Sequence, residues 1–471
     1  MKIKIPLLSI VFFANVAAGP ETIPATQPTR ITLHASPIGQ PALKHRLLPD
    51  PIELTEGNAA ILYLTASTRS LMIAMENPQT RSDLEAMATW LQAPEKEIDR
   101  SRADHLLVQF SSSLRQMELG ARREKCDWDS PVRIEGYATL LPYLQDMRTY
   151  AGLLALKARL AIIDGKYSEA AHALQTGFAL ARHLNTDGFL IQELVATHVA
   201  LSLMEQVQFW IETPGSPNLY WPLTDLPSPF IDVQAAMRLE RASAVYSIPH
   251  MKECAAGTLT GEQMNEVLEK LSEILTPVEG SNGKRDKQLL ESLKTLGAAA
   301  MMLPRANTFL KEAGYTPQAL GAMQPSQAIG LWWSQSYDIV QQEMTKSFGL
   351  PLHQALQMAP PESALNRSKD SDNPFLSLLP SITRARLTAG RLERRIAELR
   401  ALEVIRAYAA ANAGKFPENP GANPETPAPL DPFTGAPISY RAGDGALFLD
   451  MPLPPGGQAK DARIDEVRLA K

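Results

Sequence analysis

LLALKARLAIIDGKYSEAAHALQTGFALARHL, residues 153–184, is the stretch of this chain that decides its fold. Apolar residues in its first half recur every three or four positions and form one stripe of an amphipathic helix: Leu153, Leu156, Leu160 and Ile163. Gly165 then ends that helix, because glycine adopts the left-handed conformation of a helix end without strain. A second helix is expected over 168–184 and a third from about 187 to Trp210. The passage 140–210 therefore predicts packed helical hairpins.

The same periodicity predicts helices along most of the remaining chain. They are expected over about 58–75, 81–91, 102–121, 227–253, 260–275, 286–302, 325–348, 350–358 and 375–412. Near the C-terminus, two short runs at 437–441 and 446–449 flank a glycine-containing turn and predict a β-hairpin. The expected fold is mainly α, built of packed helical hairpins with a small C-terminal β-hairpin. Aromatic residues make up only 6% of the chain, which favours many thin helix–helix interfaces over one thick core.

An export signal is expected at the N-terminus. Lys2 and Lys4 precede an apolar run over 5–16, and Val16-Ala17-Ala18 forms a small-residue cleavage site. Residues 1–18 are therefore predicted to be a signal peptide that directs the chain to the periplasm, the cell envelope or the outside. The alternative is an uncleaved anchor, and membrane contact is expected only in that case.

Composition divides the rest of the chain into four parts. Residues 19–52 are rich in Pro and Thr and predict a flexible tether. Residues 53–358 carry the helical patterns and predict one helical body. The polar stretch 359–374 is expected to be a linker, and 375–471 a module made of a long helix and the hairpin.

No catalytic, cofactor or metal motif emerges from the sequence. His172, His183, Glu193 and His198 fall in neighbouring predicted helices, but their spacing matches no metal-binding motif, so ordinary surface or half-buried histidines are expected. The net charge of −5 is mild for this length and argues against a nucleic-acid partner. We therefore expect no cofactor and no metal, and we favour a non-enzymatic function.

The two cysteines, Cys126 and Cys254, allow two alternatives. In an oxidising compartment they could pair, and a disulfide closing so long a loop adds about 4–5 kcal/mol in the chain-entropy model. The favoured alternative is two separately buried thiols, because nothing in the sequence places them side by side.

Two groups of residues are candidates for an interaction surface. The predicted last helix is rich in arginine, including Arg391, Arg394 and Arg395, with glutamates interleaved. These arginines could dock an acidic partner or anionic lipid, but a solvated helix with intrahelical ion pairs is favoured. Trp332 and Trp333 could line a groove. Because adjacent side chains point about 100° apart on a helix, we expect one indole in the core and the other partly exposed.

Several phrases of the sequence together resemble a family of secreted bacterial proteins of unknown activity. These phrases are Asn58-Ala59-Ala60 with Tyr63, Cys126-Asp127-Trp128, Leu140-Leu141-Pro142, Gly165-Lys166-Tyr167, the run 179–184, Leu226-Pro227, Glu240-Arg241, Lys415-Phe416-Pro417 and Asp431-Pro432-Phe433-Thr434-Gly435. The resemblance covers most of the mature chain. It implies an exported helical architecture and no particular activity.

Two local resemblances concern parts of the chain. Gly165, Tyr167 and Ala170 resemble the turn and first packing residue of one tetratricopeptide repeat, whereas Leu174 and Gly177 depart from that family's pattern. The tail, from the last helix to the hairpin, resembles the end of type II secretion pseudopilins of the G type. It lacks their glycine- and aspartate-rich close, which puts calcium binding in doubt.

The leading hypothesis is a non-enzymatic exported or envelope-associated scaffold that binds another protein through a helical surface. The first alternative is a hydrolase or binding protein for cell-envelope polymer. It requires a pocket with converging carboxylates, drawn from Asp127, Asp129, Glu193 and Glu240. The second alternative is a component of secretion machinery, which only the tail suggests.

Overall fold

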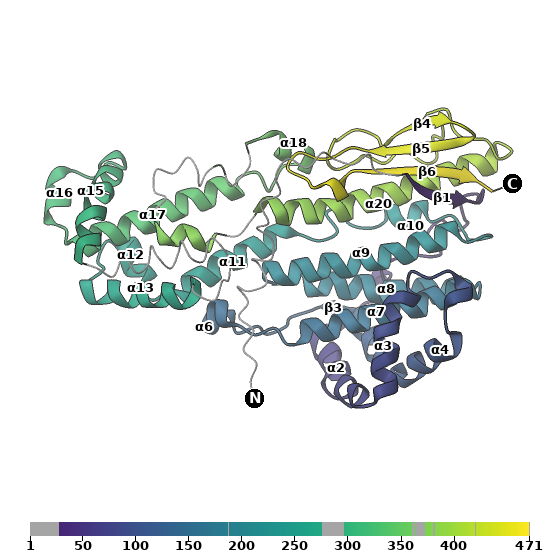
Figure 1. The fold of residues 1–471 in the computed structure, drawn as a ribbon, viewed down its shortest axis with the longest axis horizontal. Coiled ribbons are helices and arrows are strands. Elements are labelled where there is room, and N and C mark those ends of the chain that lie inside the picture. Colours follow the sequence, from purple (N-terminus) through teal and green to yellow (C-terminus); the bar gives the residue numbers. More distant parts are fainter. Residues whose placement is uncertain are drawn as a thin grey trace.

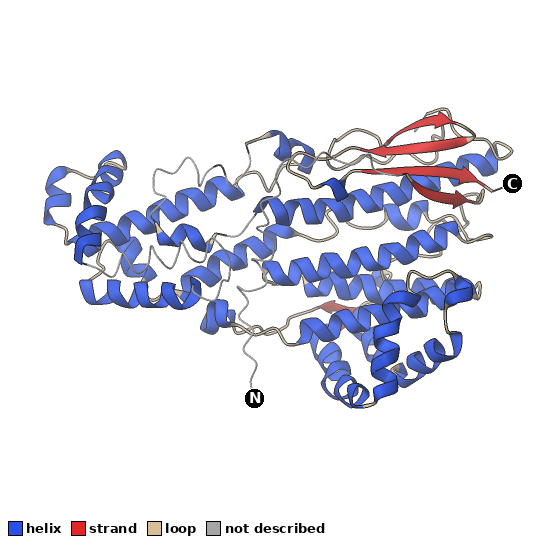
Figure 2. Ribbon diagram, viewed as in Figure 1, coloured by secondary structure: helices blue, strands red, loops and turns tan. Residues whose placement is uncertain are grey.

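The computed structural model describes residues 28–186, 188–275, 296–359, 363, 373–379, 382–419 and 421–470. The chain is mainly helical and forms an elongated molecule (Figures 1 and 2). A small mixed sheet of four strands packs at the end of the molecule where the C-terminus lies. The predicted signal peptide lies outside the described residues. Within the described part, no helix is both long and apolar enough to span a bilayer.

The predicted hairpin helices form the centre of the molecule. They are α7 (Tyr143–Ile163), α8 (Tyr167–Leu184) and α9 (Leu190–Glu212). Gly165 has φ +70°, the left-handed conformation that its place in the turn requires. A Cβ on Gly177 of α8 would lie 2.7 Å from Leu203 of α9, so glycine there permits the close approach of the two helices. The sequence prediction for this region is confirmed.

A layer of shorter helices covers α7 and α8. It contains α2 (Ala59–Glu76), α3 (Pro78–Trp90), α4 (Arg100–Gln109) and α5 (Ser111–Ala121), with β2 (Thr55–Asn58) and β3 (Arg123–Lys125) paired in parallel. The side chain of Asn77 accepts hydrogen bonds from the first turn of α3 and so separates it from α2. The helix expected over 102–121 is two helices, because the backbone leaves the helical conformation at Phe110.

The helical body has two hydrophobic cores instead of one. The second core lies among α11 (Val233–Ser247), α12 (Met251–Ala256), α13 (Gly261–Leu275), α15 (Leu296–Glu312), α16 (Pro317–Ala322), α17 (Pro325–Thr345) and the short η4 (Pro374–Leu378). These elements form the end of the molecule remote from the sheet (Figure 1). Most of the predicted linker lies outside the described residues. Its last two residues, Asn373 and Pro374, are buried beside α17.

The C-terminal module consists of α20 (Ile382–Ala411) and a four-stranded sheet in the order β1-β6-β5-β4. The predicted hairpin is present as β4 (Ser439–Gly443) and β5 (Ala446–Met451), and β6 (Arg463–Leu469) continues it. The long helix begins at Ile382 instead of residue 375, because the preceding residues form the 3₁₀ turn η4. Figure 1 shows α20 lying between this sheet and α9.

The predicted tether contributes to this sheet. Thr29–Leu33 forms β1 and pairs in parallel with β6, from Thr29 opposite Asp465 to Leu33 opposite Leu469. Ile31 and Leu33 are buried in a period of two, the pattern of a half-buried strand, although the surrounding Pro and Thr suggest a flexible segment. The prediction of a tether is therefore wrong from Thr29 onward, and the N-terminal segment is an integral part of the C-terminal module.

Candidate functional site: a groove along α20

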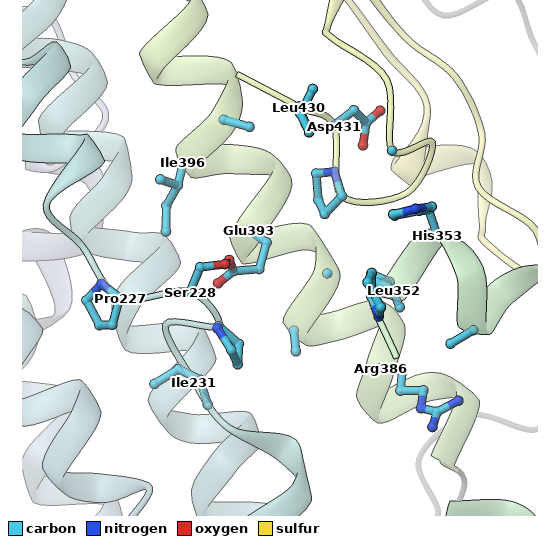
Figure 3. Close-up of a pocket in the computed structure, with 18 of the residues that line it drawn as sticks. Pro227, Ser228, Ile231, Leu352, His353, Arg386, Glu393, Ile396, Leu430 and Asp431 are labelled. Carbon is cyan, nitrogen blue, oxygen red and sulfur yellow. The ribbon is translucent and has the colours of Figure 1, made fainter. Parts of the chain in front are cut away.

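A cavity of about 760 Å³ lies between the helical body and the C-terminal module. Three separate parts of the chain and α20 line it: the loop 223–234, the region 347–355 that includes α18 (Leu352–Gln357), and the tail turn 428–435. Figure 3 shows these segments around α20. The site therefore exists only when body, tail and α20 are assembled.

One face of α20 forms the floor of this groove. Its lining residues recur every three or four positions: Arg386, Ala389, Gly390, Glu393, Ile396, Ala397 and Arg400. Arg386 and Arg400 are 14 residues apart, about 21 Å along a helix that rises about 1.5 Å per residue. Small side chains at Ala389 and Ala397 leave room above the helix between these charged residues, whereas Gly390 lets Leu352 and Phe433 approach the floor closely. The floor is thus long and is narrowed at Gly390.

Glu393 occupies the middle of the floor. Its Oε1 accepts a hydrogen bond from the backbone N–H of Phe230 at 2.7 Å, and its Oε2 accepts one from the Ser228 hydroxyl at 2.9 Å. Figure 3 shows the carboxylate directed toward Ser228. Burial raises the pKa of Glu393, against the opposing effect of these two hydrogen bonds. Glu393 therefore holds the loop of the body against α20.

The tail turn that forms the opposite wall is fixed by ionic contacts. Asp431 accepts hydrogen bonds from the Phe433 N–H and from two nitrogens of Arg394 on α20. Gly435 has φ +70°, and a Cβ there would lie 2.6 Å from the ring of His353 at the start of α18. Only glycine allows the turn and α18 to meet so closely.

The two arginines at the ends of the floor have different surroundings. Arg386 donates to the Ser347 hydroxyl at 2.8 Å and lies over the ring of Phe348. Arg400 lies over the ring of Tyr220 and donates to its hydroxyl at 3.4 Å. Tyr220 itself donates to the carbonyl of Pro427 at 2.6 Å, so Arg400 contacts an aromatic residue that is already anchored to the tail.

The arginines proposed from sequence as a docking face have another role. Arg391 binds Asp461 through two nitrogens, Arg394 binds Asp431, and Arg395 donates to Glu398 within α20 and to Glu205 and Gln208 of α9. Arg394 and Arg395 are buried. The expectation of a fully solvated helix is wrong for Arg394 and Arg395, which are buried, although the Arg395–Glu398 pair is intrahelical as expected. Together the three side chains join α20 to the tail and to the body.

Both tryptophans belong to the second core. Trp332 and Trp333 are 0% and 1% exposed, so the expectation of one exposed indole is wrong. The ring of Trp333 packs on Phe375 of η4, and α17 also meets α12, α13 and α15. A helix enclosed on several sides buries residues that point in different directions, and neither tryptophan lines the groove.

Cys126 and Cys254 are both buried thiols and form no disulfide with each other. Cys126 belongs to the first core and Cys254 to the second. Burial raises the pKa of Cys254 to about 12, which keeps that thiol protonated and unreactive at neutral pH.

The carboxylates proposed for polymer hydrolysis do not surround one cavity. Asp127 is exposed in a turn, whereas Glu193 is buried in α9 and accepts from Thr197. Glu240 accepts from the backbone N–H of Leu190. None of the four, Asp129 included, lines the groove.

The histidines considered as metal ligands are separated as well. His172 contacts Arg122 and Glu118, and His183 contacts the Tyr63 hydroxyl at 2.8 Å. Burial lowers the pKa of His183 to about 4, so that ring is neutral in the folded protein. Within the described ranges, no three His, Cys, Asp or Glu side chains gather as a metal site.

The structure brings distant sequence phrases together in two places. Asn58 bonds to both backbone groups of Asp127, and the ring of Tyr63 stacks on Trp128, whose indole donates to the His183 carbonyl. The second place is the groove, where Leu226-Pro227 and residues of the 431–435 turn line the same cavity. Sequence reasoning missed the groove itself. The available signal was the row of small residues between Arg386 and Arg400 on one helical face.

Comparison with known proteins gives no assignment: no protein-family model matches the chain, and neither curated proteins nor solved structures contain a match.

Proposed function

We propose that this chain is a non-enzymatic exported scaffold that binds an extended segment of another protein in the groove along α20. The observation that carries the proposal is the extent of the site, a cavity of about 760 Å³ whose lining residues on α20 span about 21 Å. An extended chain rises about 3.3 Å per residue, so about six residues span this floor. Clefts that bind peptides and small molecules combine apolar walls with a few placed polar groups, and this groove has that composition.

The walls of the groove support binding without rearrangement. Asp431 is fixed by Arg394, and the loop at Ser228 is fixed by Glu393. Polar groups already held in place do not have to be ordered when a ligand enters, and this reduces the entropic cost of association. Because both oxygens of Glu393 accept hydrogen bonds from the protein, we assign this carboxyl group a structural role instead of an acid–base role.

Two sequence features belong to the same proposal. Export through the predicted leader would place the groove in the periplasm or at the cell envelope. The α7–α8 hairpin, with Tyr167 stacked on Trp210 and Ala170 fully buried, would be a single tetratricopeptide-like unit that supports α9 and, through it, α20.

Site-specific photocrosslinking in intact cells tests the proposal. A photoreactive residue at Leu430, which is 57% exposed at the groove, should give discrete protein adducts. The same residue at Met301, 70% exposed on α15 and outside the groove, is the matched control and should not give them. Ala389→Trp, which fills the floor, should abolish the adducts, whereas Ala410→Trp on the exposed end of the same helix should not. Identical adduct patterns from both positions, or no adduct at Leu430, would overturn the proposal.

A further inference from the structure

We infer that the segment bound in the groove carries a carboxylate, from an acidic side chain or a free chain end, that pairs with Arg400. This inference rests on the proposed function and names the chemistry of its ligand. It starts from a difference between Arg400 and the other arginines in the same part of α20.

The arginines around Arg400 are each paired with a carboxylate. Arg391 binds Asp461, Arg394 binds Asp431, Arg395 binds Glu398 and Arg406 binds Glu403. Arg400 forms no ion pair with any residue in the described part of the chain. Its Nε is buried there without a hydrogen-bond partner, and its one hydrogen bond, to Tyr220, is long at 3.4 Å.

A buried guanidinium nitrogen without an acceptor is costly, because it has lost water and gained nothing in return. The ring of Tyr220 stabilises the charge from one side only. Arg400 also lines the groove and is partly exposed there. A carboxylate entering from the groove would approach the terminal nitrogens of the guanidinium and neutralise a charge that no carboxylate among the described residues balances, with the planar geometry that arginine matches best.

The rest of the groove restricts the other positions of the ligand. Glu393 lies seven residues from Arg400, about 10 Å along the helix. A second acidic group of the ligand at that distance from Arg400 would lie beside the carboxyl group of Glu393, so the middle of the segment should be uncharged. Apolar side chains suit the walls formed by Leu226, Ile231 and Ile396. The expected ligand is therefore about six residues long, apolar at its centre and acidic at the end near Arg400.

A fatty-acyl carboxylate shares the anionic end but fits the groove less well. Its chain would cover Glu393 and Ser228 and offer no donor to the acceptor sites that their existing hydrogen bonds leave free. A peptide presents a backbone amide or carbonyl at each residue along the same path. The distribution of polar groups along the floor therefore favours a peptide.

The test is selection of random hexapeptides with free carboxyl ends on the full mature chain, followed by fluorescence anisotropy with the peptides recovered. The selected sequences should either carry Asp or Glu at one terminus or lose binding when their carboxyl end is amidated. Arg400→Gln should weaken their binding about tenfold or more, as expected for loss of a charge-assisted hydrogen bond. Arg400→Lys should retain part of the affinity, since it keeps the charge. Arg441→Gln, at an exposed arginine of β4, is the matched control and should bind normally.

The other outcomes distinguish failure of the carboxylate inference from failure of the proposed function. Peptides that require the open groove, as judged by Ala389→Trp, but are indifferent to Arg400→Gln and to amidation would overturn the carboxylate inference and leave the proposed function standing. If no groove-dependent peptide is recovered, both fail. Groove-dependent binding of a fluorescent anthroyloxy-palmitate in that case would identify a lipid site instead. Circular dichroism melting of each variant separates loss of binding from loss of fold.

Discussion

On α20, Arg391, Arg394 and Arg395 are paired with carboxylates, whereas Arg400, which lines the groove, forms no ion pair with the residues that the structure describes. Arg394 donates four hydrogen bonds: its Nε and Nη2 to the carboxylate of Asp431, and its Nη1 to the carbonyls of Pro452 and Asp461. Arg400 contacts the ring of Tyr220 and donates one long hydrogen bond to its hydroxyl. The charge of Arg394 therefore stabilises the contact of α20 with the tail. The charge of Arg400 remains available for a ligand in the groove.

The largest loss of stability is expected when an ion pair between α20 and the tail is broken. Arg394→Ala leaves Asp431 buried without its cation, and removing one member of a buried ion pair costs about 3–5 kcal/mol. Urea unfolding followed by circular dichroism measures the loss. Arg441→Ala removes an arginine from an exposed pair with Asp450 and should cost less than about 1 kcal/mol. Equal losses from the two variants would contradict the assembly role of Arg394.

A smaller loss is expected where the groove floor meets its wall. A Cβ on Gly390 would lie 2.5 Å from Leu352 and 2.7 Å from the ring of Phe433, so Gly390→Ala forces both side chains to shift. Overpacking of this kind costs about 1–3 kcal/mol. The control is Gly261→Ala at the start of α13, where a Cβ meets nothing within 4 Å. A melting temperature of Gly390→Ala equal to that of the control would show that floor and wall are not in close contact.

The periodic patterns predicted the helices because amphipathic spacing is local information, as in α7, α8 and α9. The contribution of β1 could not be predicted in this way, since Thr29 pairs with Asp465 across almost the whole chain. The role of Arg394 likewise depends on Asp431 in a distant turn, and a single sequence does not reveal that pairing. The burial of both Trp332 and Trp333 does not follow from amphipathic spacing, which gives a helix one buried face, because α17 is enclosed by α12, α13 and α15. The small residues between Arg386 and Arg400 are a local sign of the groove floor, but its walls depend on three chain segments meeting α20, which no local pattern encodes.

The stability of the ion-paired contacts between α20 and the sheet should also depend on pH. Asp465 on β6 is fully buried beside Glu398 of α20, with Arg463 bound to both and Arg395 bound to Glu398. Burial, followed by the neighbouring Glu398 carboxylate, raises the pKa of Asp465 above its ordinary value. Between the ordinary and the raised pKa the folded protein binds more protons than the unfolded chain, so stability falls as pH rises through that window.

Asp465→Asn removes this titration. The variant should therefore gain stability relative to the wild type as pH increases from 4 to 8, with the free energy of unfolding measured in urea at each pH. Asp450→Asn, which removes a more exposed carboxylate of β5, is the control, and the gain with pH should be larger for Asp465→Asn. Parallel pH profiles for the wild type and Asp465→Asn would rule out a proton held at this contact.

The smallest effect on stability is expected at Arg400, and this expectation separates the two sides of α20 most sharply. Arg400→Gln leaves no carboxylate stranded, because none is paired with Arg400 among the described residues. It removes a cation–π contact with Tyr220 worth about 0.5–1 kcal/mol and relieves the unsatisfied Nε, so the two changes oppose each other. The free energy of unfolding should change by less than about 1 kcal/mol, in contrast to Arg394→Ala. A loss as large as that of Arg394→Ala would mean that Arg400 is part of the assembly side after all, and its charge would then not be available to a ligand.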